Sequence, residues 1–159
     1  MLLYSLLLLG SCGFERKDVK TLMDHEASKI NYTPEQTTIE ALNRITAPRG
    51  HLSKRAPSEL KVWKISGTLR LVRLEADQDL HVVISDGSYS IIVEIPSPNC
   101  TKSLLLTNLR STREAALRAH KGATVEVTGS AFFDFAHHQT GHALNYIELH
   151  PLLTFVEKP

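Results

Sequence analysis

One stretch brings together the strand patterns and the polar side chains that decide the interpretation of this chain. Residues 129–151 have the sequence GSAFFDFAHHQTGHALNYIELHP. Apolar residues alternate with others on both sides of a polar loop, as in two strands joined by a hairpin. Four of the eight histidines lie here, with other polar residues among them: His137, His138, His142 and His150, with Asp134, Gln139, Asn145 and Glu148. Polar groups gathered at the end of a hairpin predict a site without specifying its chemistry.

The alternation extends outward from this loop in both directions. Residues 123–135 form a predicted strand in which Val125, Val127 and every second residue up to Phe135 share one face. Residues 143–156 hold the next strand, in which Ile147 and Leu149 face one way. Its other face is polar and carries Tyr146, Glu148 and His150. Each strand therefore presents one face to a core.

Three more strands and one helix precede this hairpin. The strands are predicted over residues 62–74, 80–84 and 89–95, and Asp86-Gly87 marks a hairpin turn between the last two. In the first strand Ile65, Gly67, Leu69 and Leu71 share a face. Residues 103–120 carry an apolar stripe at helical spacing, and Gly122 follows as a C-cap.

The order of three strands, a helix and two strands is that of the OB-fold, a five-stranded, partly open barrel. The sequence therefore predicts a mainly β protein with an OB-like barrel over residues 61–157. Another small antiparallel barrel or an α+β sheet is the alternative. Residues 13–60 are predicted to be an irregular arm or linker, with a short helix over 39–44 capped by Thr38. This segment is either a tether or an ordered arm wrapped over the barrel.

Composition bounds the class of protein. The chain has 159 residues, which indicates one domain. Its formal net charge is +1 and its Lys and Arg residues are scattered, so there is no strong basic patch to attract nucleic acid or an acidic membrane. The two cysteines, Cys12 and Cys100, are too few for a disulfide scaffold, and the chain lacks a C-x-x-C pair.

The first twelve residues resemble a secretory signal. An apolar run is followed by Leu9-Gly10-Ser11-Cys12, similar to a bacterial lipoprotein cleavage box in which the cysteine carries the lipid. We therefore predict an extracytoplasmic protein, membrane-anchored by lipidation of Cys12. In that case Cys100 has no partner and is a buried or half-buried thiol. The absence of Lys or Arg before the apolar run argues against a signal; a misplaced start residue or a buried N-terminal segment are the alternatives.

Polar residues form two groups along the chain. The first lies around the turn after residue 74, where Asp79 and His81 share a strand face. The second belongs to the final hairpin. The candidate polar cluster comprises Asp79, His81, Asp134, His137, Gln139, Asn145, Glu148 and His150. Such groups bind a metal, act as general acids or bases, or simply hydrogen-bond the loop backbone; the sequence leaves all three open.

Function follows from the fold class more than from any motif. The sequence has none of the serine-hydrolase, zinc-peptidase or phosphate-loop signatures, and it specifies no cofactor. OB-folds bind oligonucleotides and oligosaccharides on the face of their second and third strands, with aromatic stacking; the candidates here are Trp63, Tyr89, Phe132 and Tyr146. We predict a binding module for nucleic acid, glycan or a protein ligand. The alternative is a metal-dependent hydrolase, such as a nuclease, that uses Asp79, His81, Asp134, His137, Glu148 and His150.

The polar motifs together resemble a bacterial family of exported, lipoprotein-like proteins. Its pattern is E-x-D-x-D-x-H followed by an Asp, then I-x-E-I-P, then G-x-x-F-F-D-x-x-H-G-Q-T-G and N-x-I-E-L-H-P. The chain matches at residues 75–86, at Glu94-Ile95-Pro96 and through most of 129–151, and departs at His138, where the pattern has Gly. The resemblance implies an exported, OB-like domain and brings no activity with it.

Overall fold

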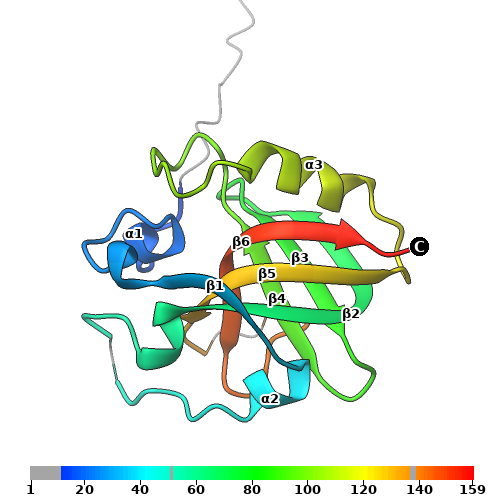
Figure 1. The fold of residues 1–159 in the computed structure, drawn as a ribbon, viewed down its shortest axis with the longest axis horizontal. Helices are drawn as coiled ribbons and strands as arrows, with labels where there is room; N and C mark the ends of the chain where they lie inside the picture. The colour runs from blue at the N-terminus through cyan, green and yellow to red at the C-terminus, as the bar shows by residue number, and fades with distance from the viewer. Residues whose placement is uncertain (1–11, 51, 137–138) are drawn as a thin grey trace, which may run out of the picture.

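The computed structural model describes residues 12–50, 52–136 and 139–159, which form one small barrel with an arm folded against it (Figure 1). The helices are α1 (Lys17–Lys20), α2 (Ile39–Asn43) and α3 (Leu109–Arg118), with short 3-10 turns η1 (Ala27–Lys29) and η2 (Pro57–Leu60). The strands are β1 (Asn31–Gln36), β2 (Lys61–Leu74), β3 (Leu80–Ser85), β4 (Ser90–Ile95), β5 (Thr124–Phe133) and β6 (Ile147–Glu157).

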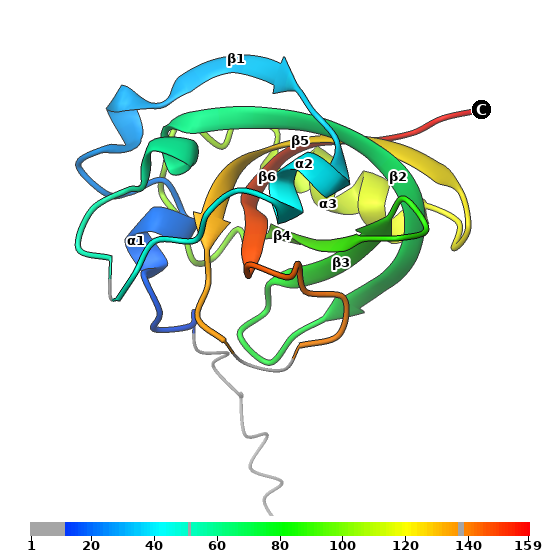
Figure 2. The same cartoon turned by 90° about the horizontal axis from the view of Figure 1, so that it is seen from below.

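The barrel is closed by five strands. The sheet order is β1-β2-β3-β4-β6-β5, and β2 also pairs with β5, so the strands from β2 to β6 form a ring, which Figure 2 shows nearly end-on. Four of the five joins are antiparallel and β4 runs parallel to β6. The predicted mainly β, OB-like barrel is confirmed.

β2 is long and curved, and it pairs with strands on both of its sides. Its first half pairs with β5 and its second half with β3. A Cβ on Gly67 would lie 2.8 Å from Ile39 Cδ1 and 3.0 Å from the Ser85 carbonyl oxygen, so only glycine fits at this crossing. A register shift between Leu69 and Leu71 corrects the prediction for this strand: Val72, rather than Leu71, packs against the core.

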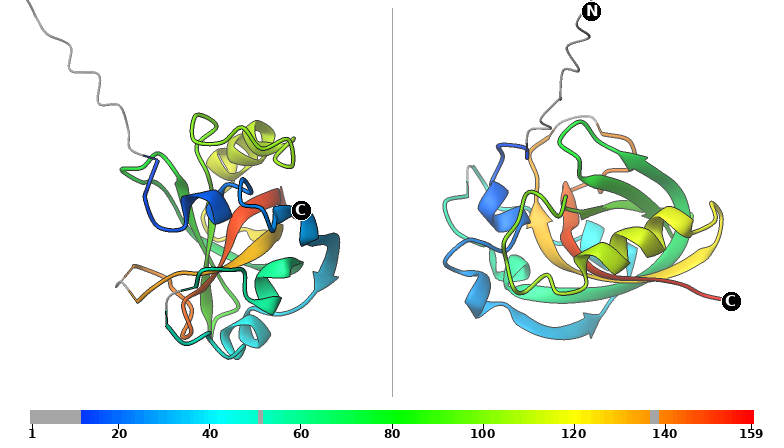
Figure 3. Two further views of the ribbon diagram at one scale, coloured as in Figure 1. Left: turned by 90° about the vertical axis from the view of Figure 1, so that its left-hand side faces the viewer. Right: turned by 90° about the horizontal axis from the view of Figure 1, so that it is seen from above.

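The interior is apolar, and a helix covers each end. Strand residues such as Ile65, Ile84 and Val127 are fully buried. α3 lies across one end and α2 at the other (Figures 1 and 3). The helix predicted over 103–120 is shorter than expected, because the Thr101 and Ser103 hydroxyls accept bonds from backbone N–H groups two residues on and hold that segment in turns.

Residues 12–60 form an ordered arm over the described ranges, which decides between the two alternatives for this segment. β1 adds to the edge of the barrel by pairing parallel to β2. Two ion pairs with buried members hold the arm: Arg16 bonds both carboxylate oxygens of Glu59, at 2.6 and 2.8 Å, and Arg55 bonds Asp24 at 2.6 Å. Thr38 caps α2 as predicted by accepting a hydrogen bond from Ala41 N.

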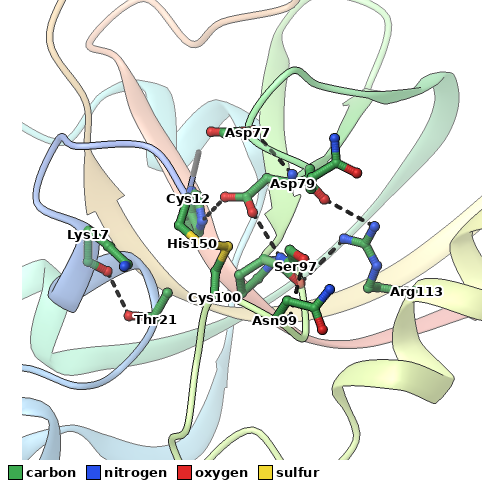
Figure 4. Close-up of a disulfide and its surroundings, with 12 residues drawn as sticks. Cys12, Lys17, Thr21, Asp77, Asp79, Ser97, Asn99, Cys100, Arg113 and His150 are labelled. Atoms are coloured by element: carbon green, nitrogen blue, oxygen red, sulfur yellow. Dashed lines mark hydrogen bonds and ion pairs between the residues drawn. A yellow bond between two sulfur atoms is a disulfide. The ribbon is translucent and has the colours of Figure 1, made fainter. Parts of the chain in front are cut away.

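A disulfide joins Cys12 to Cys100, which was predicted to have no partner if Cys12 carries a lipid. Cys12 and Cys100 are 88 residues apart in sequence, yet the folded arm brings their Cα atoms to 5.4 Å and their sulfur atoms are bonded (Figure 4). A sulfur in a disulfide cannot also carry a thioether lipid, so the disulfide and a lipid on Cys12 are mutually exclusive. No helix in the described parts of the chain has the length and apolar character that a membrane crossing needs.

Candidate functional site

The outer face of β3, β4 and β6 is polar and yet buried. His81, Glu94, Glu148 and His150 occupy strand positions that point away from the apolar interior, because their neighbours in sequence are the core residues. Each is at most 5% exposed. Residues of the arm and of the loop after β5 cover them, so these ionisable groups lie in a second, charged core.

His150 lies at the centre of this second core. Its Nδ1 atom is 3.1 Å from Glu94 Oε2 and 3.9 Å from Glu148 Oε2, and its Nε2 atom is 3.5 Å from Asp79 Oδ2. Among the described residues, neither nitrogen has a partner with hydrogen-bond geometry, so these short separations are charge contacts rather than directed bonds. The Phe132 ring meets the imidazole edge to face, with centroids 5.7 Å apart.

The carboxylates around His150 are held by fixed donors. His81 Nδ1 lies 2.9 Å from Glu94 Oε1, and His81 Nε2 lies 3.2 Å from the Thr140 carbonyl oxygen. Asp79 accepts a 2.8 Å bond from the backbone N–H of Ser97 through Oδ1, which leaves Oδ2 facing His150. The free oxygens of Asp79 and Glu94 therefore point toward one imidazole.

Burial and charge shift the pKa values in opposite directions. Burial disfavours ionisation of Glu94, but His150 and His81 outweigh it and hold its pKa well below the usual range. Burial, and next the Glu94 charge, raise the pKa of Glu148 to about 7. Burial opposes the charged form of His150, yet the carboxylates of Asp79, Glu148 and Glu94 raise its pKa well above the ordinary value. The two glutamates are therefore shifted in opposite directions, and Glu94 is the one whose ionised form is favoured.

The arm supplies two cations to this face. Lys20 Nζ lies 4.9 Å from the centre of the Phe132 ring, and the Arg16 guanidinium lies 5.0 Å from it. Arg16 is neutralised by Glu59, whereas burial opposes the charge of Lys20 and Asp134, Glu148, Glu94 and Asp79 together raise its pKa. Lys20 thus serves as an internal counter-ion for the carboxylates.

A cavity of about 450 Å³ opens between the arm and the barrel beside this cluster. The β2–β3 turn contributes Glu75, Asp77 and Asp79, and the loop after β5 contributes Asp134 and Gln139. Glu94 reaches it from β4, and the arm lines it with Cys12 and with two lysines, Lys17 and Lys20, which the carboxylates outnumber. Figure 4 shows the disulfide beside Asp79 and His150. The two loops are those that OB-folds use for ligand binding, so this acidic pocket has the customary position of an OB ligand site.

The structure divides the predicted cluster. It brings together Asp79, His81, Glu148 and His150, and it places Asp134 and Gln139 at the mouth of the acidic pocket. Asn145 lies elsewhere: its amide donates to the Leu42 and Ile45 carbonyls and pins α2. His137 lies outside the described residues.

The predicted cluster lacked Glu94, Lys20 and Asp77, which belong to the site. Glu94 is directly opposite His81 across the β3–β4 pair, so alternation in two neighbouring strands could have joined them. Lys20 gave no such signal, because it lies 59 residues before Asp79 in a segment without a strand pattern.

Comparison with known proteins adds the fold alone. No protein-family model and no curated protein matches the sequence. A protein of Leishmania major Friedlin assigned as an aspartyl-tRNA synthetase is 12% identical, with a TM-score of 0.51 over 83% of this chain and 23% of that chain. An aspartyl-tRNA synthetase from Entamoeba histolytica is 13% identical, with a TM-score of 0.51 over 79% of this chain and 22% of that chain. The chain thus spans less than a quarter of these proteins.

Proposed function

We propose that this chain is an OB-fold binding module that takes a cationic ligand in the acidic pocket. The observation that carries the proposal is the convergence of Asp77, Asp79, Glu94 and Asp134 from two loops and a strand onto one cavity. A cation entering there gains the attraction of several carboxylates in a partly desolvated site, where charge interactions are stronger than in bulk water. Lys20 already illustrates the kind of group that this pocket favours.

Nucleic acid and glycan fit this pocket less well than a cation does. Phosphates would meet carboxylates of their own sign, and the net charge of +1 supplies no compensating field. Two of the aromatic residues that could stack on a base or sugar are engaged. Phe132 is fully buried beneath Lys20 and Arg16, and Trp63 lies under Lys61 with its indole N–H bonded to the Ser58 carbonyl.

A binding experiment tests the ligand class. Calorimetry of the full chain with spermidine should show salt-sensitive binding, whereas single-stranded oligothymidylate should not bind. Asp77→Asn with Asp134→Asn should weaken spermidine binding several-fold. Glu114→Gln removes a carboxylate on the exposed face of α3, outside the pocket, and should leave spermidine binding unchanged. The proposal would be contradicted if the wild type bound oligothymidylate but not spermidine, and if the double variant still bound oligothymidylate.

We also propose that the protein is exported. A lone disulfide that ties the arm to the barrel supports this, since disulfides persist mainly in oxidising compartments. The alternative is that the Cys12 sulfur carries a lipid instead of forming the disulfide. Thiol alkylation and mass spectrometry of protein from its native host separate the two: an unreactive Cys100 supports the exported disulfide form, whereas a lipid-bearing Cys12 with an alkylated Cys100 supports the anchor. An intact Met1 terminus on cytosolic protein would contradict export.

A metal-dependent hydrolase is the second candidate, and the grouping of Asp79, Glu94 and His150 favours it. Carboxylates and an imidazole beside an open cavity are the ligands of catalytic zinc sites, which keep one position for water or substrate. Hydrolysis of a chromogenic phosphodiester that requires Mn²⁺ or Zn²⁺ and disappears in His150→Gln would support it. Equal rates in wild type and variant would assign the hydrolysis to a contaminant.

A further inference from the structure

We propose that Asp79, Glu94 and His150 coordinate a divalent transition-metal ion, with Zn²⁺ the best fit, at the inner end of the acidic pocket. This inference rests on the proposed function, in which the pocket takes a cation, and it specifies which cation and which atoms hold it. It assigns the ion to the floor of the cavity rather than to its mouth.

The spacing of the donor atoms carries the inference. One ligand atom from each of Asp79, Glu94 and His150 lies within 4.8 Å of the others. Ligands at about 2.0–2.2 Å from a tetrahedral zinc are roughly 3.3 Å apart, so the shell needs side-chain shifts of about 1 Å to close. One ion can use only one imidazole nitrogen, and each nitrogen already has one carboxylate close by: His150 Nδ1 lies 3.1 Å from Glu94 Oε2, and His150 Nε2 lies 3.5 Å from Asp79 Oδ2.

Unpartnered polar atoms provide a second, independent indication. His150 is fully buried, and within the described ranges neither of its nitrogens forms a hydrogen bond. Glu148 Oε2 is also buried without a partner there, 3.9 Å from His150 Nδ1. Buried polar atoms are almost always satisfied in folded proteins, so three exceptions around one imidazole call for a ligand. A coordinated ion would satisfy one of the two imidazole nitrogens, and its positive charge would offset the negative charge of the surrounding carboxylates.

The groups behind the ligands are arranged as in metal sites. His81 holds the far oxygen of Glu94, and the Ser97 N–H holds the far oxygen of Asp79. The edge-to-face Phe132 ring restricts the rotation of the His150 imidazole. Outer partners of this kind fix the orientation of first-shell ligands and are a usual part of metal centres.

The donor set selects the class of ion. One imidazole with two carboxylates suits zinc and its first-row neighbours, whereas calcium and magnesium prefer oxygen ligands alone. Asp79 and Glu94 line the cavity and His150 lies behind them, so the remaining coordination position faces the pocket. Three protein ligands with one open position leave that position to water or to a ligand from the pocket.

Zinc titration of chelator-treated protein, with its disulfide intact, tests the site. By calorimetry the wild type should bind one Zn²⁺ tightly, and His150→Gln and Asp79→Asn should each weaken binding at least tenfold. The control is His120→Ala, which removes an imidazole from an exposed His–Glu pair with Glu157 and should leave the tight site intact. X-ray absorption of the zinc-loaded wild type needs no variant and should show one imidazole among oxygen ligands.

The outcomes separate this inference from the proposed function. Spermidine binding without tight zinc binding would overturn the metal site and leave the cation-binding module standing. Zinc binding lost in His120→Ala but kept in His150→Gln would also overturn it, as would an absorption spectrum without an imidazole ligand. Binding of neither spermidine nor zinc would overturn both proposals.

Discussion

The two sides of the barrel wall are built on opposite principles. Inside, residues such as Ile65, Ile84 and Val127 are fully buried and apolar, and they bring no polar group that needs a partner. Outside, under the arm, His81 and His150 are equally buried among carboxylates. The interior is stabilised by removing apolar surface from water, whereas the outer core carries a desolvation cost that only its charge partners offset.

This difference indicates which side serves function. Proteins rarely bury several ionisable groups together unless the groups are paired or bind a ligand. The interior tolerates other apolar side chains that fill the same volume, whereas the outer core needs particular ionisable residues at particular positions. Substitutions on the two sides should therefore differ in size and in pH dependence.

The largest effect is expected inside the barrel. Val127→Asp places a charge where the side chain is fully buried and has no partner, so we expect a loss of several kcal/mol, enough to unfold a domain of ordinary stability. Circular dichroism and thermal melting measure it. Thr128→Asp, one residue on and facing out beside Thr154, should cost about 1 kcal/mol or less. A folded Val127→Asp protein with an unchanged melting temperature would mean that this face is not the core.

A smaller loss is expected where the arm meets the barrel. Arg16→Met leaves the fully buried Glu59 carboxylate without its cation, which costs about 3–5 kcal/mol for a broken buried pair. Urea unfolding measures the change. Arg118→Met removes a comparable but exposed pair with Glu114 and should cost no more than about 0.5 kcal/mol. Equal effects of the two substitutions would mean that the arm does not bury this ion pair.

The outer core should also respond to pH in a way that the interior cannot. The folded-state pKa of Glu148, about 7, lies above its unfolded value of 4.5, so its contribution to stability is complete below pH 4.5 and is lost as the pH rises to about 7. Glu148→Gln stays neutral and escapes this loss. The free energy of unfolding of Glu148→Gln, relative to that of wild type, should therefore rise by on the order of 3 kcal/mol as the pH increases from 4.5 to 7.

A second carboxylate gives the control for this pH series. The pKa of Glu126 is lowered by hydrogen bonds from Lys64 and Lys158, so its contribution to stability is present above its unfolded pKa and is lost as the pH falls. Glu126→Gln should therefore change relative stability in the opposite direction to Glu148→Gln. Stability curves of wild type and Glu148→Gln that run parallel from pH 4.5 to 7 would show that Glu148 is not held in a desolvated, acidic environment.

The interior could be predicted from the sequence because its signal is local. Alternation along β3 to β6 gives the inward residues, and the strand order gives the OB-like topology. The departures have local causes that alternation does not encode, such as the register shift near Leu69 and the hydroxyl-stabilised turns before α3. These departures changed where elements begin and which side chains face the core, but they left the strand order unchanged.

The outer core could be predicted only in part. Asp79, His81, Glu148 and His150 stood out because charged residues at alternate strand positions are conspicuous. What buries them is an arm that lies far from them in sequence and has no periodic pattern. The contacts of Lys20 with Phe132 and of Cys12 with Cys100 depend on how that arm folds back, which spacing along the chain does not encode.

Anomalous diffraction at the zinc edge tests the central claim, that the outer core is a cation site, most directly. Crystals of the wild type grown with one equivalent of Zn²⁺ should give one dominant peak, about 2 Å from oxygens of Asp79 and Glu94 and from a nitrogen of His150. Lys20 should then be displaced from the cluster by the added charge. A dominant peak at the exposed His120 and Glu157, with none beside His150, would contradict the account.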